Sequence, residues 1–336
     1  MANPSVDLLL AADVGGTHTR LRLCAGPERR IVREATLDSA GGASFEALVA
    51  PWLARTQGSV RAAAIGVAGP VVDGVCRATN LPWTLRARAI ATALGVGEVL
   101  LVNDLAAIAV GCTLVSPDRV SWLAAGRPPR RGGNVAVINA GTGLGQALLV
   151  WDGERHVPSA SEGGHASFAP RDDEEVALLA FARARRGGRG AHVSWERVLS
   201  GPGLGLLYDF ELARSGAGEP AAVARALARG DRNAAIARLG LLGRSPHAAA
   251  ALDRLADLYG AEAGNLALKG LATGGVYLCG NVARSLAPSR GGRLLAAMRD
   301  KGRMRGLLAR MPVGVVLDER VGLLGATHLA ARLATG

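Results

Sequence analysis

The chain has 336 residues, of which 49% are hydrophobic and 20% charged, a composition that excludes a disordered protein. Its formal net charge of +11 comes almost wholly from arginines spread along the sequence, which indicates a usage bias rather than a nucleic-acid-binding arm. No apolar run reaches the roughly 20 residues that a membrane helix needs. The length favours two domains. Four widely spaced cysteines and a start without a basic leader favour a cytoplasmic protein.

The first predicted element is a hairpin, with strands over Leu8–Asp13 and Thr19–Cys24 joined by a turn at Gly15-Gly16. Glycines permit positive φ angles and bring backbone N–H groups close to a ligand. Asp13 ends the first strand and Thr17 adds a hydroxyl, so the turn suits a magnesium-bound phosphate. Taken alone, the stretch fits a plain hairpin turn with a solvated aspartate better.

A second hairpin of the same kind is predicted over Val135–Val150, where a buried strand runs into Gly141, Thr142 and Gly143. A second strand again leaves the turn. Two phosphate-type hairpins in one chain indicate two related lobes that close on one nucleotide.

Strands and helices alternate between the two hairpins, which predicts an α/β arrangement with helices on a mixed sheet. In chain order we expect strand Ile31–Thr36, a helix near Phe45–Arg55, strand Ala62–Ala68, a helix near Leu85–Leu94, strand Glu98–Val102 and a helix that begins with Leu105. Around Pro117–Arg131 the composition turns to Pro, Arg and Gly, and we expect the passage between the lobes there.

The second half of the chain is predicted to be mainly helical. We expect helices at Asp172–Arg185, Leu204–Arg214, Ala221–Arg229, Ala234–Leu239 and Pro246–Leu271, strands at Val276–Cys279 and Val313–Leu317, and a closing helix at Gly322–Ala331. Gly274-Gly275 and Gly280-Asn281 flank the first of these strands. These glycines either mark the two ends of the strand or let the backbone lie against an adenine ring.

Four polar residues stand where ligands bind in such folds, and each also has a structural explanation. Asp104 follows a buried strand, at the end where α/β sheets bind ligands, but aspartate is also a preferred helix cap. Glu162 and His165 share a glycine-rich loop and suit a polyhydroxylated ligand, although a lone loop histidine is usually structural. Glu196 follows Ser194, so a first-turn acid in a capped helix also explains it.

In their order along the chain, these stretches resemble the ATP-dependent bacterial glucokinases, of the superfamily that joins sugar kinases to actin and the heat-shock chaperone ATPases. The resemblance covers nearly the whole chain, and its motifs are Asp13–Thr17, Leu101–Ala107, Gly141–Gly145, Ser161–His165, Glu196–Gly203, Gly274–Val276 and Gly322–Gly325. The chain lacks the clustered cysteine zinc motif of the related repressor/kinase (ROK) group.

The resemblance implies a two-lobed α/β fold of the actin-like ATPase (ribonuclease H-like) type with a cleft between the lobes. The expected small lobe is 1–116 with a C-terminal helix at about 319–336, and the large lobe is 117–318.

The implied activity is transfer of the γ-phosphoryl group of ATP to the 6-hydroxyl of D-glucose, with Mg²⁺, by a homodimer. By resemblance, Asp104 is the base that takes the hydroxyl proton, and Asn103, Glu162, His165 and Glu196 hold the other hydroxyls. Asp13 acts on the magnesium through water. The phosphates lie on Gly15, Gly16, Thr17, Gly141, Thr142 and Gly143, and Gly275 with its neighbours lines the adenosine pocket.

Three positions depart from the family pattern: His18 replaces a usual Asn, Asn281 replaces a usual glycine, and the loop Arg183–Gly190 looks inserted before Glu196. A kinase for another hexose, such as mannose, fructose or an N-acetyl amino sugar, remains an alternative. A non-catalytic sugar-sensing regulator would need a helix-turn-helix, for which we expect no room before the first strand. A chaperone or actin-like ATPase would not need the Ser161–His165 motif.

Overall fold

A five-stranded sheet forms the core of the first lobe in the computed structural model, which describes residues 7–124, 132–185, 187–188 and 190–335. The strand order is β3-β2-β1-β4-β8, with β1, β4 and β8 parallel and β2 and β3 antiparallel to their neighbours. The strands are β1 (Asp7–Val14), β2 (His18–Ala25), β3 (Arg30–Asp38), β4 (Ser59–Val67) and β8 (Glu98–Asn103). Because carboxyl ends of parallel strands share one edge of a sheet, Asp13 and Asp104 come to the same edge.

The two faces of this sheet are covered by different helices because successive side chains of a strand point to opposite faces. Leu8 and Leu10 pack into one core with α1 (Phe45–Leu53) and α2 (Ala87–Leu94). Leu9 belongs to a second core with α3 (Asp104–Cys112) and α12 (Val321–Thr335). A small sheet of β5 (Val71–Val72), β6 (Val75–Arg77) and β7 (Thr84–Arg86), which sequence reasoning did not predict, extends the first of these cores.

The second sheet repeats the arrangement of the first. Its order is β12-β11-β10-β13-β14-β9, with an antiparallel β12-β11-β10 meander and parallel β10, β13 and β14. The strands are β9 (Val120–Ala124), β10 (Val135–Ala140), β11 (Leu144–Trp151), β12 (His156–Ser161), β13 (Gly275–Cys279) and β14 (Val313–Val316). Two lobes built on one plan confirm the expected actin-like architecture.

Strand β9 is the exception to this repeat, and it lies in the stretch that was expected to be only a passage between the lobes. After a 3₁₀ turn at Pro117–Arg119, it adds an antiparallel edge strand beside β14. The rest of the expected passage, residues 125–131, lies outside the described residues, as do residues 1–6, 186, 189 and 336.

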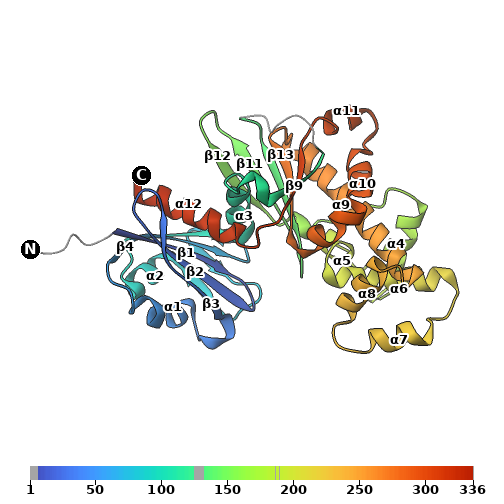
Figure 1. Ribbon diagram of the computed structural model, residues 1–336, viewed down its shortest axis with the longest axis horizontal. Helices are drawn as coiled ribbons and strands as arrows, with labels where there is room; N and C mark the ends of the chain where they lie inside the picture. The colour runs from blue at the N-terminus through green and yellow to red at the C-terminus, as the bar shows by residue number, and fades with distance from the viewer. Residues whose placement is uncertain (1–6, 125–131, 186, 189, 336) are drawn as a thin grey trace, which may run out of the picture.

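Helices make up most of the second lobe and gather on the side away from the first lobe (Figure 1). They are α4 (Asp173–Ala184), α5 (Trp195–Val198), α6 (Gly201–Ser215), α7 (Ala221–Leu227), α8 (Arg232–Leu241), α9 (Pro246–Gly270), α10 (Gly280–Arg299) and α11 (Arg305–Leu308), with 3₁₀ turns at Gly163–His165 and Gly302–Met304. Another 3₁₀ turn, at Ser39–Gly41, follows β3 in the first lobe. Sequence reasoning predicted no helix where α10 lies. None of the helices within the described ranges is long and apolar enough to cross a membrane.

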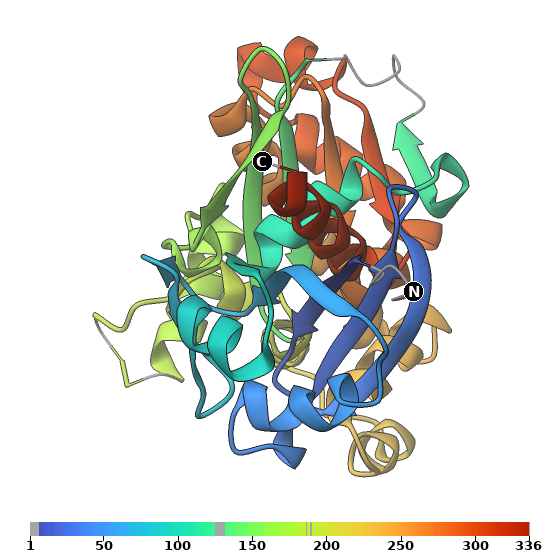
Figure 2. The ribbon, with the colours of Figure 1, turned by 90° about the vertical axis from the view of Figure 1, so that its left-hand side faces the viewer.

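Helix α12 ends the described chain but lies along β1 and β4 of the first sheet, beside α3 (Figures 1 and 2). Glycines let α3 and α12 approach closely: a Cβ at Gly111 would overlap the carbonyl oxygen of Val321, and one at Gly325 would overlap that of Ala107. The core that contains α3 and α12 also includes residues of the second sheet, such as Val137. These two helices therefore lie between the sheets. The predicted lobe boundaries at 116/117 and 318/319 stay predictions.

Candidate functional site

Asp104 stands at the junction of β8 and α3, and the neighbouring Asn103 is the residue that caps the helix. The Asn103 Oδ1 accepts a hydrogen bond from the Leu105 N–H at 2.9 Å, and its Nδ2 donates to the Gly69 carbonyl at 3.1 Å. Asp104 occupies the first turn, where its Oδ1 also accepts from Leu105 N–H at 2.9 Å. The capping role considered for Asp104 thus belongs to Asn103, and the aspartate has a free carboxylate oxygen.

The environment of Asp104 makes its carboxylate more basic than usual. Burial, together with the smaller effect of the Asp13 and Glu162 charges, raises the pKa of this carboxyl to about 6, and the hydrogen bond from Leu105 opposes the rise in part. A carboxylate with a pKa near the operating pH is suited to accept a proton from a hydroxyl group.

One cavity of about 200 Å³ brings together all five residues that were predicted to bind the sugar. Asn103 and Asp104 come from the edge of the first sheet, whereas Glu162, His165 and Glu196 come from the second lobe. The turn Gly141–Gly143 and the residues Ala68, Gly69, Thr79, Asn80, Leu105, Asn139, Leu144, Gly145 and Ser161 complete the lining.

The loop that carries Glu162 and His165 is held against β11 by its glycines. A Cβ at Gly164 would overlap the Leu144 carbonyl oxygen, so no larger residue fits there without a shift of the backbone. The Glu162 Oε2 and His165 Nε2 atoms lie 3.9 Å apart, and these side chains are 54% and 60% exposed. Both groups thus face open solvent with free hydrogen-bonding capacity.

Glu196 reaches across to the second glycine turn. Its Oε2 accepts a hydrogen bond from the Leu144 N–H at 3.0 Å and lies 2.6 Å from where a Cβ of Gly143 would stand. The Gly201 N–H donates to the Gly141 carbonyl at 2.7 Å from the other side. Although the loop Arg183–Gly190 precedes it, Glu196 still reaches the cavity; Arg186 and Arg189 of that loop lie outside the described residues.

The turn glycines do not adopt positive φ angles, which corrects one expectation from the sequence, and Gly16 and Gly143 serve close packing instead. Gly15, Gly16, Gly141 and Gly143 all have negative φ. A Cβ at Gly16 would stand 2.8 Å from the Asn80 Cβ. The first turn, which includes Thr17, does not line the cavity. Asp13, next to this turn, nevertheless raises the pKa of Asp104 through its negative charge.

Asp13 lies at the carboxyl end of β1, with its Oδ2 3.3 Å from Nη1 of Arg20. Burial raises the pKa of this carboxyl, and the Arg20 guanidinium offsets part of that rise. Within the described residues, no group of three His, Cys, Asp or Glu side chains is arranged to hold a metal ion. The Asp13 carboxylate is an oxygen donor of the kind that Mg²⁺ binds.

The structure does not bring Gly275 to the glycine turns. Gly275 pairs with Val135 at the start of β10, whereas Gly141 follows the end of that strand. Gly280, at the other end of β13, has a φ of 89°, and a Cβ there would overlap the Ala140 carbonyl oxygen. Gly280 and Asn281 are therefore the residues of this segment that lie beside the second turn.

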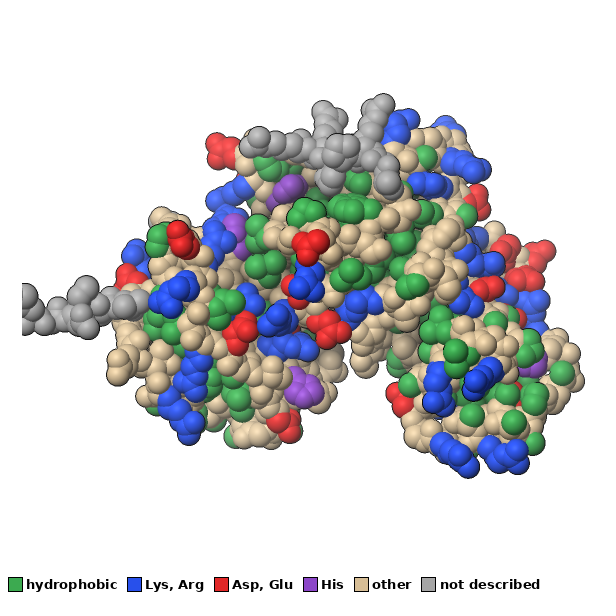
Figure 3. Space-filling view, in the orientation of Figure 1, with side chains coloured by type: hydrophobic (Ala, Val, Ile, Leu, Met, Phe, Trp, Pro, Cys, Tyr) green, Lys and Arg blue, Asp and Glu red, His purple; other side chains and the backbone are tan. Residues whose placement is uncertain are grey.

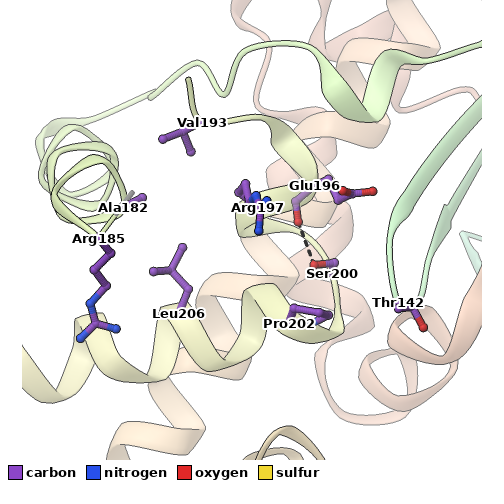
Figure 4. Close-up of a pocket in the computed structure, with 9 residues that line it drawn as sticks. All are labelled: Thr142, Ala182, Arg185, Val193, Glu196, Arg197, Ser200, Pro202 and Leu206. Carbon is purple, nitrogen blue, oxygen red and sulfur yellow. Dashed lines mark hydrogen bonds between the residues drawn. The ribbon is translucent and has the colours of Figure 1, made fainter. Parts of the chain in front are cut away.

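A second cavity of about 230 Å³ adjoins the first and shares Thr142 and Glu196 with it. Figure 4 shows Ala182 on α4, Arg185 directly after that helix and Leu206 on α6, with the Glu196 carboxylate directed towards the strands on the side of Thr142. The remaining lining residues are Val193, Arg197, Ser200 and Pro202. Sequence reasoning singled out Thr142 and Glu196 but not this cavity, because its other wall comes from Ala182, Arg185 and Leu206, to which no motif assigns chemistry.

Comparisons of sequence point to a single family. A family profile described as glucokinase matches residues 10–333. A glucokinase from Nostoc sp. is 36% identical over 97% of this chain and 99% of the relative. Glucokinases from Synechocystis sp. (96% of this chain, 98% of the relative) and Yersinia pestis (94% of each) are both 35% identical.

Solved structures agree with this assignment. A glucokinase from an Antarctic psychrotroph superimposes with a TM-score of 0.81 at 28% identity, covering 97% of this chain and 99% of that one. Balamuthia mandrillaris glucokinase, solved with glucose, has a TM-score of 0.82 at 19% identity (98% and 95% covered). A ROK family glucokinase from Streptomyces griseus, solved with glucose and AMPPNP, has a TM-score of 0.62 at 23% identity (97% and 99% covered). The last two show the fold alone.

Proposed function

The chain belongs to the glucokinase family, and on this premise we propose that it transfers the γ-phosphoryl group of ATP to the 6-hydroxyl of glucose in the cavity that contains Asp104. One observation carries the assignment of the site. Residues from both lobes, far apart in sequence and each suited to a sugar hydroxyl or a phosphate, line one cavity. A coupled phosphorylation assay over a panel of hexoses, with ATP, ADP and polyphosphate as donors, tests the proposal. A clear preference for mannose, fructose or an N-acetyl amino sugar would contradict it.

Asp104 is the proposed general base. Phosphoryl transfer asks little covalent chemistry of the protein, so positioning of the hydroxyl and removal of its proton are what these residues supply. The free oxygen of the Asp104 carboxylate and its raised pKa both support this role.

Asn103, Glu162, His165 and Glu196 are the proposed partners of the other hydroxyls. The Asn103 amide uses one N–H on Gly69, which leaves its second N–H for a ligand. Glu162 and His165 offer an acceptor and a ring nitrogen within one loop. Glu196 supports both the sugar and the glycine turn, since it already bonds to Leu144 N–H.

The nucleotide phosphates are proposed to lie between the two glycine turns, with Gly15, Gly16 and Thr17 on one side and Gly141, Thr142 and Gly143 on the other. Mg²⁺, when bound with ATP, neutralises phosphate charge during transfer. Asp13 would hold this ion through water. We propose Gly280 and Asn281 for the adenosine end, because they lie beside the second turn where Gly275 does not. Homodimer formation and a cytoplasmic location remain predictions from the resemblance.

The sugar loop gives a prediction that separates sugar binding from nucleotide binding. Glu162→Gln and His165→Ala should each weaken glucose binding far more than ATP binding, because a hydroxyl group would lose a charged or ring-nitrogen partner. Calorimetric titration with each ligand checks this, and Arg303→Ala, an exposed change in the second lobe, serves as the control. Equal losses for both ligands would instead indicate that the loop shapes the fold and not the sugar site.

A pH profile tests the base. Because protonated Asp104 cannot accept a proton, kcat/KM for glucose should fall as the pH drops below about 6. Glu162→Gln should move this fall to lower pH, since the Glu162 charge helps to raise the pKa of Asp104. Glu196→Gln should leave its position unchanged, because the Glu196 carboxylate bonds to Leu144 on another wall. A profile that stays flat down to pH 5 would rule out Asp104 as the base.

A further inference from the structure

A cavity of about 380 Å³ lies at the end of the first sheet that is opposite to Asp13. It is formed where β1 begins, where β2 turns into β3, where β4 begins and where α12 ends. Three arginines, Arg29, Arg61 and Arg332, stand around a lining that includes Leu9, Pro27, Ala331 and Ala334. We propose that this cavity is a second ligand site, which binds a phosphate monoester with an apolar body.

The charge in this cavity differs in sign from the charge at the sugar site. The described lining of the sugar cavity holds three carboxylates and no Arg or Lys, whereas this cavity holds three guanidinium groups and one carboxylate, that of Asp7. Basic side chains (Lys and Arg) are spread over both lobes on the visible face of the molecule (Figure 3), so a single arginine does not by itself indicate a site. Three of them around one cavity provide a positive field for an anion.

One of these arginines, Arg29, contacts His328, and the pKa of His328 responds to the charges of both Arg29 and Arg332. The Arg29 Nη1 lies 3.2 Å from the His328 Nδ1. Burial lowers the pKa of His328, and the charges of Arg29 and Arg332 lower it further. The imidazole is thus a neutral acceptor beside two cations and does not compensate their charge. Arg61 is 3.7 Å from Asp7, an exposed pair that water screens.

The shape and chemistry of the cavity select the class of ligand. Guanidinium groups bind phosphate oxygens in a bidentate geometry, and a monoester dianion can engage more than one of them. Leu9 is 9% exposed and, with the small apolar residues of α12, offers a floor for an apolar substituent. Arg29 adopts a left-handed conformation with a φ of 54°, which is uncommon outside glycine and orients its side chain from a tight turn.

Binding here is independent of the proposed phosphoryl transfer, because the two sites lie at opposite ends of α12. The first turn of that helix is near Asp13, where a Cβ at Gly322 would stand 3.6 Å from the Asp13 carboxyl group. Arg332 lies ten residues further on, about 15 Å along the helix axis.

Calorimetry with phenyl phosphate tests the proposal on the full chain, with the sugar cavity occupied by saturating glucose and AMPPNP. We expect one molecule bound per chain, weaker binding of inorganic phosphate, and no binding of phenol. Arg29→Ala and Arg332→Ala should each weaken phenyl phosphate binding by at least about ten-fold, as expected for the loss of a charge-assisted bond. Arg332→Lys should retain part of the affinity, because it keeps the charge without the bidentate geometry.

Arg303→Ala removes an exposed arginine charge from the second lobe, away from this cavity, and is the control. If Arg303→Ala and Arg332→Ala weakened phenyl phosphate binding equally, the effect would come from the net charge of the protein and not from this cavity, and the proposal would be overturned. Failure of phenyl phosphate to bind at millimolar concentration would do the same. Thermal denaturation of each variant identifies loss of fold, and Asp104→Asn should bind phenyl phosphate as the unmodified chain does, whatever its effect on glucose phosphorylation.

Discussion

Asp104→Asn is expected to remove nearly all turnover while glucose still binds. A general base contributes about 10²–10⁴-fold to rate, and the amide cannot accept the hydroxyl proton. The substitution preserves the shape of the side chain and an oxygen that can accept from Leu105 N–H. A coupled assay measures turnover and calorimetry measures glucose binding. Turnover close to that of the unmodified protein would show that Asp104 only supports the start of α3.

The same substitution should raise thermal stability at neutral pH, which separates a catalytic loss from a folding defect. The pKa of Asp104 is raised in the folded state, so folding favours its protonated form, and stability falls as the pH rises towards about 6. Above that pH the buried Asp104 charge lowers the stability of the folded protein, and the nearby negative charges of Asp13 and Glu162 add to this effect. Asparagine removes this cost. A lower melting temperature for the variant at pH 7.5 would contradict the placement of Asp104 among these charges.

Gly325→Ala is expected to cause the largest loss of stability among helical glycine substitutions. The new Cβ would overlap the Ala107 carbonyl oxygen of α3, and backbone cannot move aside as a flexible side chain does. Overpacking of this kind costs about 1–3 kcal/mol, occasionally more. Denaturant titration measures the free energy of unfolding.

Gly292→Ala is the matched control, since Gly292 also lies within a helix but has no heavy atom within 4 Å of the new Cβ. Alanine should stabilise that helix by about 0.5–1 kcal/mol. If both substitutions changed stability alike, the contact between α3 and α12 would not be as close as described.

Much of the fold could be predicted because its strands are short apolar runs that end in glycine or in polar residues. The two hairpins, β4, β8 and the long helix α9 follow directly from such patterns. Helix α10 could not be predicted, because Pro288, Gly291 and Gly292 interrupt its pattern and lower its intrinsic propensity. Its contact with α9 overrides this: a Cβ at Gly260 would overlap the Leu294 carbonyl oxygen, so the two helices pack backbone to backbone.

The candidate site was predictable where residue type and strand ends coincide, as at Asp104. The sequence does not show which of two neighbouring polar residues has the structural role and which is free to bind a ligand. Asn103 and Asp104 both suit a helix start, and only the structure shows that Asn103 is the cap, with its amide group also fixed by a bond to the Gly69 carbonyl. The contact between Glu196 and Leu144 likewise joins residues 52 positions apart, and no local pattern encodes it.

The close crossing of α3 and α12 has a mechanical consequence. Helices whose backbones touch cannot slide past one another without separating, so relative motion of the two lobes has to be taken up in the joints that follow α3 and precede α12. These joints are residues 113–119 and 317–320, and the Leu317 N–H bonds to the Arg119 carbonyl at 2.9 Å. Because this hydrogen bond joins the two connecting segments at one point, they should act together as a single hinge. The lobes would then have one easy direction of rotation, and twisting or sliding motions between them would be stiff.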